Sequence, residues 1–169
     1  MKKKNIYIIG AGGHAKTCID IIESDKIFKI LYLVNKKINK IKKIFNYRVI
    51  DEKSFFNKKL KNISIVLGIG QIKNPNPREV IYNFYKKKIF KFPNIISKFS
   101  YVSKNSKLSD SILIGHGAVI NASSKIGSNC IINNRSLIEH DVEIGKNCHV
   151  STGAIINGGA KIGSNTFIG

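Results

Sequence analysis

Four histidines, His14, His116, His140 and His149, are the side chains in this 169-residue chain best suited to accept a proton near neutral pH. His140 stands out because Asp141 follows it directly. A neighbouring carboxylate fixes the tautomer of an imidazole and stabilises its charged form. Such a pair can serve as a general base for an attacking amine or hydroxyl. We predict His140 and Asp141 as catalytic residues, with a solvated corner histidine as the alternative.

A glycine pair, Gly158-Gly159, lies one 18-residue interval beyond His140. Glycines let an extended ligand pass close to the backbone, and an exposed N–H there is a candidate donor to a developing oxyanion. In the sequence, His149 lies between His140 and Gly158, and it is either a ligand contact or a surface turn residue. His116 is expected to be structural, and Asn133 and Asn134 are weaker candidates for a polar contact near the base.

These residues lie within a six-residue repeat of thirteen consecutive aliphatic positions. Each aliphatic residue is followed four positions later by a mostly small residue, which we expect to point inward. Three hexapeptides form a triangular coil of 18 residues, so the twelve complete hexapeptides predict a parallel β-helix of four coils. The aliphatic positions are Ile96, Val102, Leu108, Ile114, Ile120, Ile126, Ile132, Ile138, Ile144, Val150, Ile156, Ile162 and Ile168.

Glycine or asparagine commonly follows the aliphatic residue, as at Gly115 and Asn121, and we expect positive φ there. Cys130 and Cys148 are 18 residues apart and should stack inside successive coils. With Cys18 they make three cysteines without metal-ligand spacing, so we expect reduced thiols, no disulfide and no metal.

The N-terminal part begins with an apolar strand at residues 5–9, a glycine loop and a helix at 17–24. Gly10, Gly12 and Gly13 permit close approach of a ligand, and the helix start favours an anion such as a phosphate. His14 lies in this loop, where it either contacts substrate or caps the helix. The loop lacks the third glycine of the dinucleotide fingerprint.

The second strand, residues 30–34, ends in Asn35-Lys36, where a dinucleotide-binding domain would carry an acid. A redox role is therefore disfavoured, and Asn35 becomes a candidate substrate contact. Further strands at 47–50 and 63–68 and a helix at 78–88 complete a Rossmann-like βαβ domain. Gly68 and Gly70 should lie at its ligand-facing edge. We place the boundary near Pro93, giving domains 1–93 and 94–169.

The net charge of +19 is concentrated in residues 1–95, which carry +16, against +3 in residues 96–169. Only 3 of the 29 basic residues are Arg, whereas base and phosphate recognition favour Arg. We therefore expect no nucleic-acid partner, although the charge would attract anionic substrates. The sequence has no run long enough to cross a bilayer and no signal peptide at its start, which predicts a cytoplasmic protein without stable membrane insertion.

The opening Ile-Ile-Gly-Ala-Gly-Gly-His-Ala-Lys of residues 8–16, combined with the repeat, resembles the NeuD-type sugar acyltransferases. This resemblance implies a left-handed β-helix and acetyl-CoA as co-substrate, held near His149, Gly158 and Gly159. It also implies a nucleotide sugar bound by the N-terminal domain, His140 as base, and a homotrimer with each active site between two subunits.

We therefore expect an acetyl-CoA-dependent enzyme that acetylates the amino group of a nucleotide-linked 4-amino sugar, with UDP as the carrier, in glycan or surface-polysaccharide synthesis. The alternatives are a sialic acid O-acetyltransferase and a non-catalytic nucleotide-sugar-binding scaffold. No nucleophilic serine or cysteine motif is present, which favours direct transfer over an acyl-enzyme. The sequence ends at Gly169 partway through a coil, which we interpret as a truncated or short member.

Overall fold

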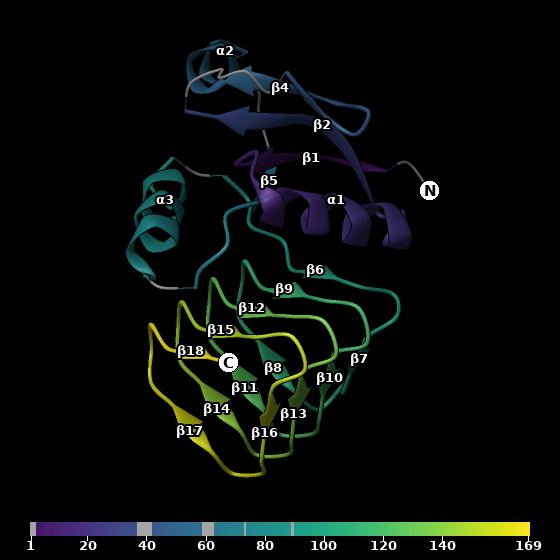
Figure 1. The fold of residues 1–169 in the computed structure, drawn as a ribbon, viewed down its shortest axis with the longest axis vertical. Coiled ribbons are helices and arrows are strands. Elements are labelled where there is room, and N and C mark those ends of the chain that lie inside the picture. The colour runs from purple at the N-terminus through teal and green to yellow at the C-terminus, as the bar shows by residue number, and fades with distance from the viewer. Residues whose placement is uncertain (1–2, 37–41, 59–62, 73, 89) are drawn as a thin grey trace.

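A computed structural model describes residues 3–36, 42–58, 63–72, 74–88 and 90–169. An N-terminal α/β part lies against one face of a C-terminal β-helix (Figure 1). The α/β part ends with α3 at Lys86, and the first β-helix strand begins at Ile95. The expected α/β-then-β-helix architecture is thus confirmed.

The α/β part is a five-stranded sheet in the order β3-β4-β2-β1-β5. Strands β1, β2, β4 and β5 are parallel, and β3 runs antiparallel to β4. The strand bounds are β1 Lys4–Ile9, β2 Phe28–Asn35, β3 Lys43–Ile44, β4 Tyr47–Asp51 and β5 Ser64–Leu67. The helices are α1 Gly13–Asp25, α2 Glu52–Asn57 and α3 Asn76–Lys86.

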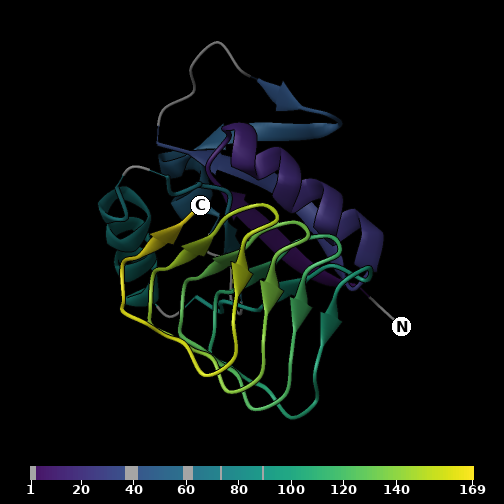
Figure 2. The same ribbon diagram turned by 60° about the horizontal axis from the view of Figure 1, so that its bottom comes forward.

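Helix α1 holds the two parts of the molecule together. Its buried face includes Ala15, Cys18 and Ile22, which share one core cluster with sheet residues and with Leu113 and Ile131 of the β-helix. Figure 2 shows α1 running alongside the β-helix coils. Burial of this continuous apolar surface fixes the orientation of the α/β part on the β-helix.

The prediction from sequence placed the start of α1 too late and missed two short elements. The helix begins at Gly13, inside the glycine loop, with Gly12 as an N-cap that makes no side-chain hydrogen bond. Helix α2 follows β4 directly because the side chain of Asp51 caps it, accepting from the backbone N–H of Ser54 at 2.7 Å. Strand β3 was also not anticipated.

The β-helix consists of thirteen two-residue strands, and the predicted aliphatic residue is the second residue of each. Three parallel sheets form its faces, with orders β18-β15-β12-β9-β6, β16-β13-β10-β7 and β17-β14-β11-β8. Their strands are β6 Ile95–Ile96, β7 Tyr101–Val102, β8 Lys107–Leu108, β9 Leu113–Ile114, β10 Val119–Ile120, β11 Lys125–Ile126, β12 Ile131–Ile132, β13 Leu137–Ile138, β14 Glu143–Ile144, β15 His149–Val150, β16 Ile155–Ile156, β17 Lys161–Ile162 and β18 Phe167–Ile168.

The outward residues give each sheet a distinct surface. The sheet of β6, β9, β12, β15 and β18 faces the α/β part, and we call it the docking sheet. The sheet of β7, β10, β13 and β16, here the apolar sheet, presents Tyr101, Val119, Leu137 and Ile155. The sheet of β8, β11, β14 and β17, here the charged sheet, presents Lys107, Lys125, Glu143 and Lys161.

The corners differ from expectation in one respect. Positive φ occurs three residues after the aliphatic position, as at Asp141 (59°) and Asn147 (55°), and not directly after it. Glycine at the predicted positions has another cause, because a Cβ on Gly127 would lie 2.6 Å from the backbone of Gly145 in the next coil. Coil stacking, rather than chain reversal, therefore requires glycine there.

Candidate active site

His140 and Asp141 lie at the corner between the apolar and charged sheets, which points away from the α/β part (Figure 1). The Nδ1–H of His140 donates to Oδ2 of Asp141 at 2.8 Å. This bond leaves Nε2 unprotonated in the neutral ring and able to accept a proton. Both side chains are open to a ligand, with 67% of His140 and 63% of Asp141 exposed.

The glycine pair lies next to His140 in the following coil. A Cβ on Gly158 would stand 2.9 Å from Cε1 and Nε2 of His140, so the ring lies directly against the Gly158 backbone. Gly159 has a φ of 72°. Its N–H donates to the His140 carbonyl at 2.9 Å, so this N–H is not free to bind an oxyanion. In the described chain the N–H of Gly158 has no backbone acceptor.

A cavity of about 580 Å³ opens at the carboxyl ends of β1 and β2, where open α/β sheets bind ligands. Gly10 and Asn35, both candidates from the sequence, line it together with Ile69. Gly10 has a φ of 110°, and a Cβ there would lie 2.8 Å from Ile69 Cγ1. A side chain at this position would therefore be strained and would press on the cavity wall.

The other predicted glycines have different surroundings. Gly12 and Gly13, at the start of α1, line a smaller hollow with Lys16 and Lys43, and a Cβ on either glycine would meet no atom within 4 Å. Gly68 packs beneath α1, where a Cβ would lie 2.6 Å from Ile8 Cγ2, so its small size serves packing.

His14 and His149 lie near each other between the α/β part and the docking sheet, outside the residues that line the cavity. A Cβ on Gly70 would lie 3.5 Å from the Cβ of His14. The buried Nε2 of His14 has no hydrogen-bond partner, and burial, followed by the charges of Arg78 and His149, lowers the pKa of His14 to about 3. His14 is therefore a neutral imidazole in the folded protein.

His149 is only 6% exposed, and its Nδ1–H donates to the backbone carbonyl of Gln71. Asn133 Nδ2 lies 3.4 Å from its Nε2, and the ring packs edge-on against Phe167. Burial is the largest cause that lowers the pKa of His149. The structure thus separates His149 from the corner that carries His140.

Buried Arg78 ties the cavity wall to the β-helix. One of its terminal nitrogens donates to the carbonyls of Leu67 and Ile69, at 3.0 and 2.6 Å, and Nε donates to the carbonyl of Asn129 at 3.4 Å. Nothing in the sequence distinguishes Arg78, because a basic residue at the start of a helix resembles a solvated one.

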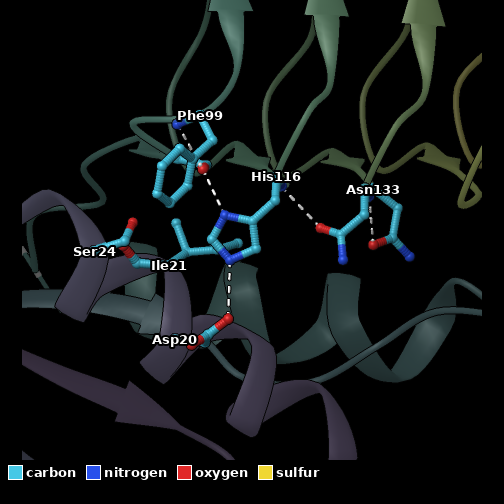
Figure 3. Close-up of polar contacts among 8 residues, drawn as sticks. Asp20, Ile21, Ser24, Phe99, His116 and Asn133 are labelled. Carbon is cyan, nitrogen blue, oxygen red and sulfur yellow. Dashed lines mark hydrogen bonds and ion pairs between the residues drawn. The ribbon is translucent and has the colours of Figure 1, made fainter.

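His116 joins the β-helix to α1 (Figure 3). Its Nε2 lies 2.9 Å from Oδ2 of Asp20 on α1, and its Nδ1 lies 2.6 Å from the Oγ of Ser97. That hydroxyl also accepts the N–H of Phe99 at 3.0 Å. Ser97 is only 1% exposed, so the Ser97–His116 pair is not accessible for nucleophilic chemistry. We interpret His116 as a contact residue between the α/β part and the β-helix.

The described residues contain no group of three His, Cys, Asp or Glu side chains that could hold a metal ion. Cys18, Cys130 and Cys148 are buried free thiols. No helix in the described part of the chain is long and apolar enough to span a membrane.

The structure therefore gathers the predicted residues in three places. The corner carries His140, Asp141, Gly158 and Gly159; the loop and cavity carry Gly10, Gly12, Gly13 and Asn35; and the contact between the two parts carries His14, Gly68, Gly70 and His149. Sequence reasoning missed Glu52 and Tyr85, which also line the cavity. The acidic pair Asp51-Glu52 directly after an apolar strand was the signal for Glu52.

Two family models match the chain. The PglD N-terminal domain matches residues 5–84, and the bacterial transferase hexapeptide, in six repeats, matches residues 123–158. The comparison with curated proteins gives no match.

Several solved structures share the fold. A histidine-to-alanine variant of GDP-perosamine N-acetyltransferase from Caulobacter crescentus, in complex with CoA and GDP-perosamine, has a TM-score of 0.86 at 23% identity, covering 96% of this chain and 76% of that chain. The acetyltransferase domain of PglB from Neisseria gonorrhoeae in complex with acetyl coenzyme A has a TM-score of 0.80 at 21% identity, covering 96% and 86%. WeeI from Acinetobacter baumannii has a TM-score of 0.67 at 14% identity, covering 99% and 95%.

The α/β part thus carries a match to the PglD N-terminal domain, and the β-helix carries a match to the bacterial transferase hexapeptide. Together with the shared fold, these matches agree with the resemblance seen in the sequence.

Proposed function

We propose that this protein transfers the acetyl group of acetyl-CoA to the amino group of a nucleotide-linked 4-amino sugar. UDP was the carrier expected from the sequence. Three of the solved structures with this fold are described with GDP-perosamine, so GDP is an equal candidate for this chain. Two of these three are described as N-acetyltransferases, which favours an amine over a hydroxyl as acceptor.

The observation that carries the proposal is the His140–Asp141 pair at an open corner. Asp141 holds the proton on Nδ1, so Nε2 is left to take a proton from the acceptor. A Cβ on Gly159 would meet no atom within 4 Å, which leaves room for the pantetheine arm and thioester of acetyl-CoA beside Gly158. The N–H of Gly158 is the remaining candidate donor to the oxyanion in this pair of glycines.

In the proposed reaction, His140 Nε2 removes a proton as the sugar amine attacks the thioester carbonyl. The carbonyl π electrons move to oxygen and form a tetrahedral oxyanion. Collapse of this intermediate restores the carbonyl, breaks the carbon–sulfur bond and releases the CoA thiolate, which accepts the proton from the His140 imidazolium. Asp141 stabilises that imidazolium while it exists. Cys130 and Cys148 are fully buried in the β-helix, which supports direct transfer.

Within one chain, the acceptor cavity and His140 lie on opposite sides of the molecule. The cavity belongs to the α/β part, which covers the docking sheet, whereas His140 lies at the opposite corner of the β-helix. We propose that a second copy brings them together. The apolar sheet next to His140 has the surface for such a contact, since Tyr101 is 59% and Ile155 is 64% exposed. A homotrimer packed through this sheet would build each site between two subunits. In such an assembly, we propose that His149 contacts acetyl-CoA.

A free-thiol assay tests the function by measuring CoA release from acetyl-CoA with UDP-, GDP- and CMP-linked sugars. We expect release with a 4-amino sugar nucleotide and acetylated nitrogen in the product. Replacing His140 by Ala should lower kcat by about 10² or more. His116→Gln serves as the matched control, because His116 lies outside the proposed site.

Full activity of the His140→Ala variant would refute the assignment of the base. Acetylation of a hydroxyl, as on a CMP-linked sialic acid, would replace the proposal with O-acetylation. Nucleotide-sugar binding without CoA release for any acceptor would indicate a non-catalytic scaffold.

A further inference from the structure

The cavity of the α/β part has no acid at the end of β2, where proteins of related topology bind the ribose of a nucleotide. Asn35 ends β2, and Lys36 follows it. The neighbouring parallel strand β4 ends at the same edge, with Asn35 paired to Asp51. Asp51 and Glu52 therefore bring acidic side chains to the edge from the next strand.

Of these two acids, only Glu52 is available to a ligand. The carboxylate of Asp51 is used within the protein, because Oδ1 accepts the N–H of Ser54 at 2.7 Å and Oδ2 accepts the Ser54 hydroxyl at 2.8 Å. Glu52 lines the cavity, whereas Asp51 does not.

A buried tyrosine holds Glu52 in position. The hydroxyl of Tyr85, on α3, donates to Oε1 of Glu52 at 2.7 Å, and Tyr85 is 1% exposed. Such a fixed partner reduces the side-chain entropy that Glu52 would lose on binding a ligand. Oε2 makes no hydrogen bond within the described protein and remains free to accept one from a ligand.

The remaining charge in the cavity matches a nucleotide. Among the described lining residues Lys36 is the one cationic side chain, and it comes from the end of β2, beside the Glu52 edge. A cation suits the diphosphate, and an acceptor-only carboxylate suits a pair of hydroxyl donors. The apolar lining, which includes Val80 and Phe84, suits the flat face of a base.

We propose that Glu52 binds the ribose 2′- and 3′-hydroxyls of the nucleotide sugar and so selects ribonucleotides. Glu52, which follows β4, thus replaces the acid that dinucleotide-binding sheets carry at the end of β2. This inference rests on the proposed function, because it needs a nucleotide in the cavity.

Calorimetry on the full chain tests the inference with six probes: UDP, GDP, and the 2′-deoxy and 3′-deoxy form of each. The wild type should bind each ribonucleotide about tenfold more tightly than its deoxy forms, as expected for a hydrogen bond to a charged group. Glu52→Ala should weaken ribonucleotide binding to the level of the deoxy forms and remove the discrimination for both bases.

Glu23→Ala is the matched control, because Glu23 accepts a hydrogen bond from Tyr47 at 2.7 Å outside the cavity. It should leave every affinity unchanged, and melting temperatures would report folding of both variants. Equal wild-type affinity for ribo and deoxy forms, or discrimination that survives in Glu52→Ala, would overturn the inference. A loss confined to one base would also overturn it, in favour of base recognition.

The proposed function can fail separately. If nucleotides bind with the expected discrimination but no acetyl group is transferred, only the function is wrong. If acetyl transfer occurs but loss of a ribose hydroxyl does not change nucleotide affinity, only the role of Glu52 is wrong. Failure of every nucleotide to bind would refute both.

Discussion

The imidazole of His140 lies against the backbone of Gly158, one coil further along the β-helix, so closely that a Cβ on Gly158 would be 2.9 Å from Nε2. Coil stacking sets this relationship, because β13, which precedes His140, pairs with β16, which precedes Gly158. Glycine is thus required at the position that faces the proposed base.

Replacing Gly158 by Ala should displace His140 without unfolding the protein. The ring is exposed and can swing outward, so we expect a loss of kcat of about tenfold or more from lost alignment of the base. Gly163→Ala is the control, because a Cβ there meets no atom within 4 Å. Steady-state kinetics and melting temperatures of both variants check the prediction, and an unimpaired Gly158→Ala enzyme would contradict it.

Replacing Asp141 by Asn should retain the backbone and remove the charge. Asp141 has a φ of 59°, which asparagine also tolerates. We expect kcat to fall by about 10² or more because the neutral amide stabilises the imidazolium less and can favour the wrong tautomer. Steady-state kinetics check this, with melting temperatures to confirm folding of the variant. An unchanged kcat would show that Asp141 plays no part in the reaction.

The β-helix could be predicted from the sequence because its period is local. Each coil buries the second residue of every strand, so the six-residue spacing of Ile138, Ile144, Val150 and Ile156 reveals the inward positions directly. The adjacency of His140 and Gly158 followed from the same 18-residue interval.

The contacts between the two parts could not be predicted in the same way. His116 and Asp20 are 96 residues apart, and His149 and Gln71 are 78 residues apart. No periodic pattern relates such pairs, because they depend on how α1 docks on the β-helix. Nothing in the sequence therefore indicated that His149 is buried against Gln71, or that Arg78 is buried.

Replacing Ile155 by Asp should prevent assembly through the apolar sheet. Ile155 is 64% exposed in one chain, and a carboxylate buried in a subunit contact carries a large desolvation penalty. Light scattering should show a trimer for the wild type and a smaller species for the variant, with acetyl transfer lost alongside. Lys107→Asp, on the charged sheet, is the control and should stay trimeric. A monomeric wild type with full activity would contradict the shared site.

Because of His14, the stability of the protein should decrease as the pH is lowered. Its pKa is lowered to about 3 by burial, then by the charges of Arg78 and His149, whereas the unfolded chain takes up this proton near pH 6.5. Between these values the unfolded state binds more protons, so the contribution is complete above about pH 6.5 and is lost as the pH falls toward 3. The loss should approach about 2 kcal/mol by pH 5.

Urea unfolding at pH 7 and pH 5 measures this effect. The His14→Gln variant should show a smaller change in unfolding free energy between the two pH values than the wild type, because its side chain does not titrate. Gly163→Ala is the control because it leaves every titrating side chain in place and a Cβ there meets no atom within 4 Å, so it should keep the wild-type pH dependence. An equal pH dependence in His14→Gln and the wild type would mean that His14 is protonated in the folded protein, contrary to its buried position between the two parts.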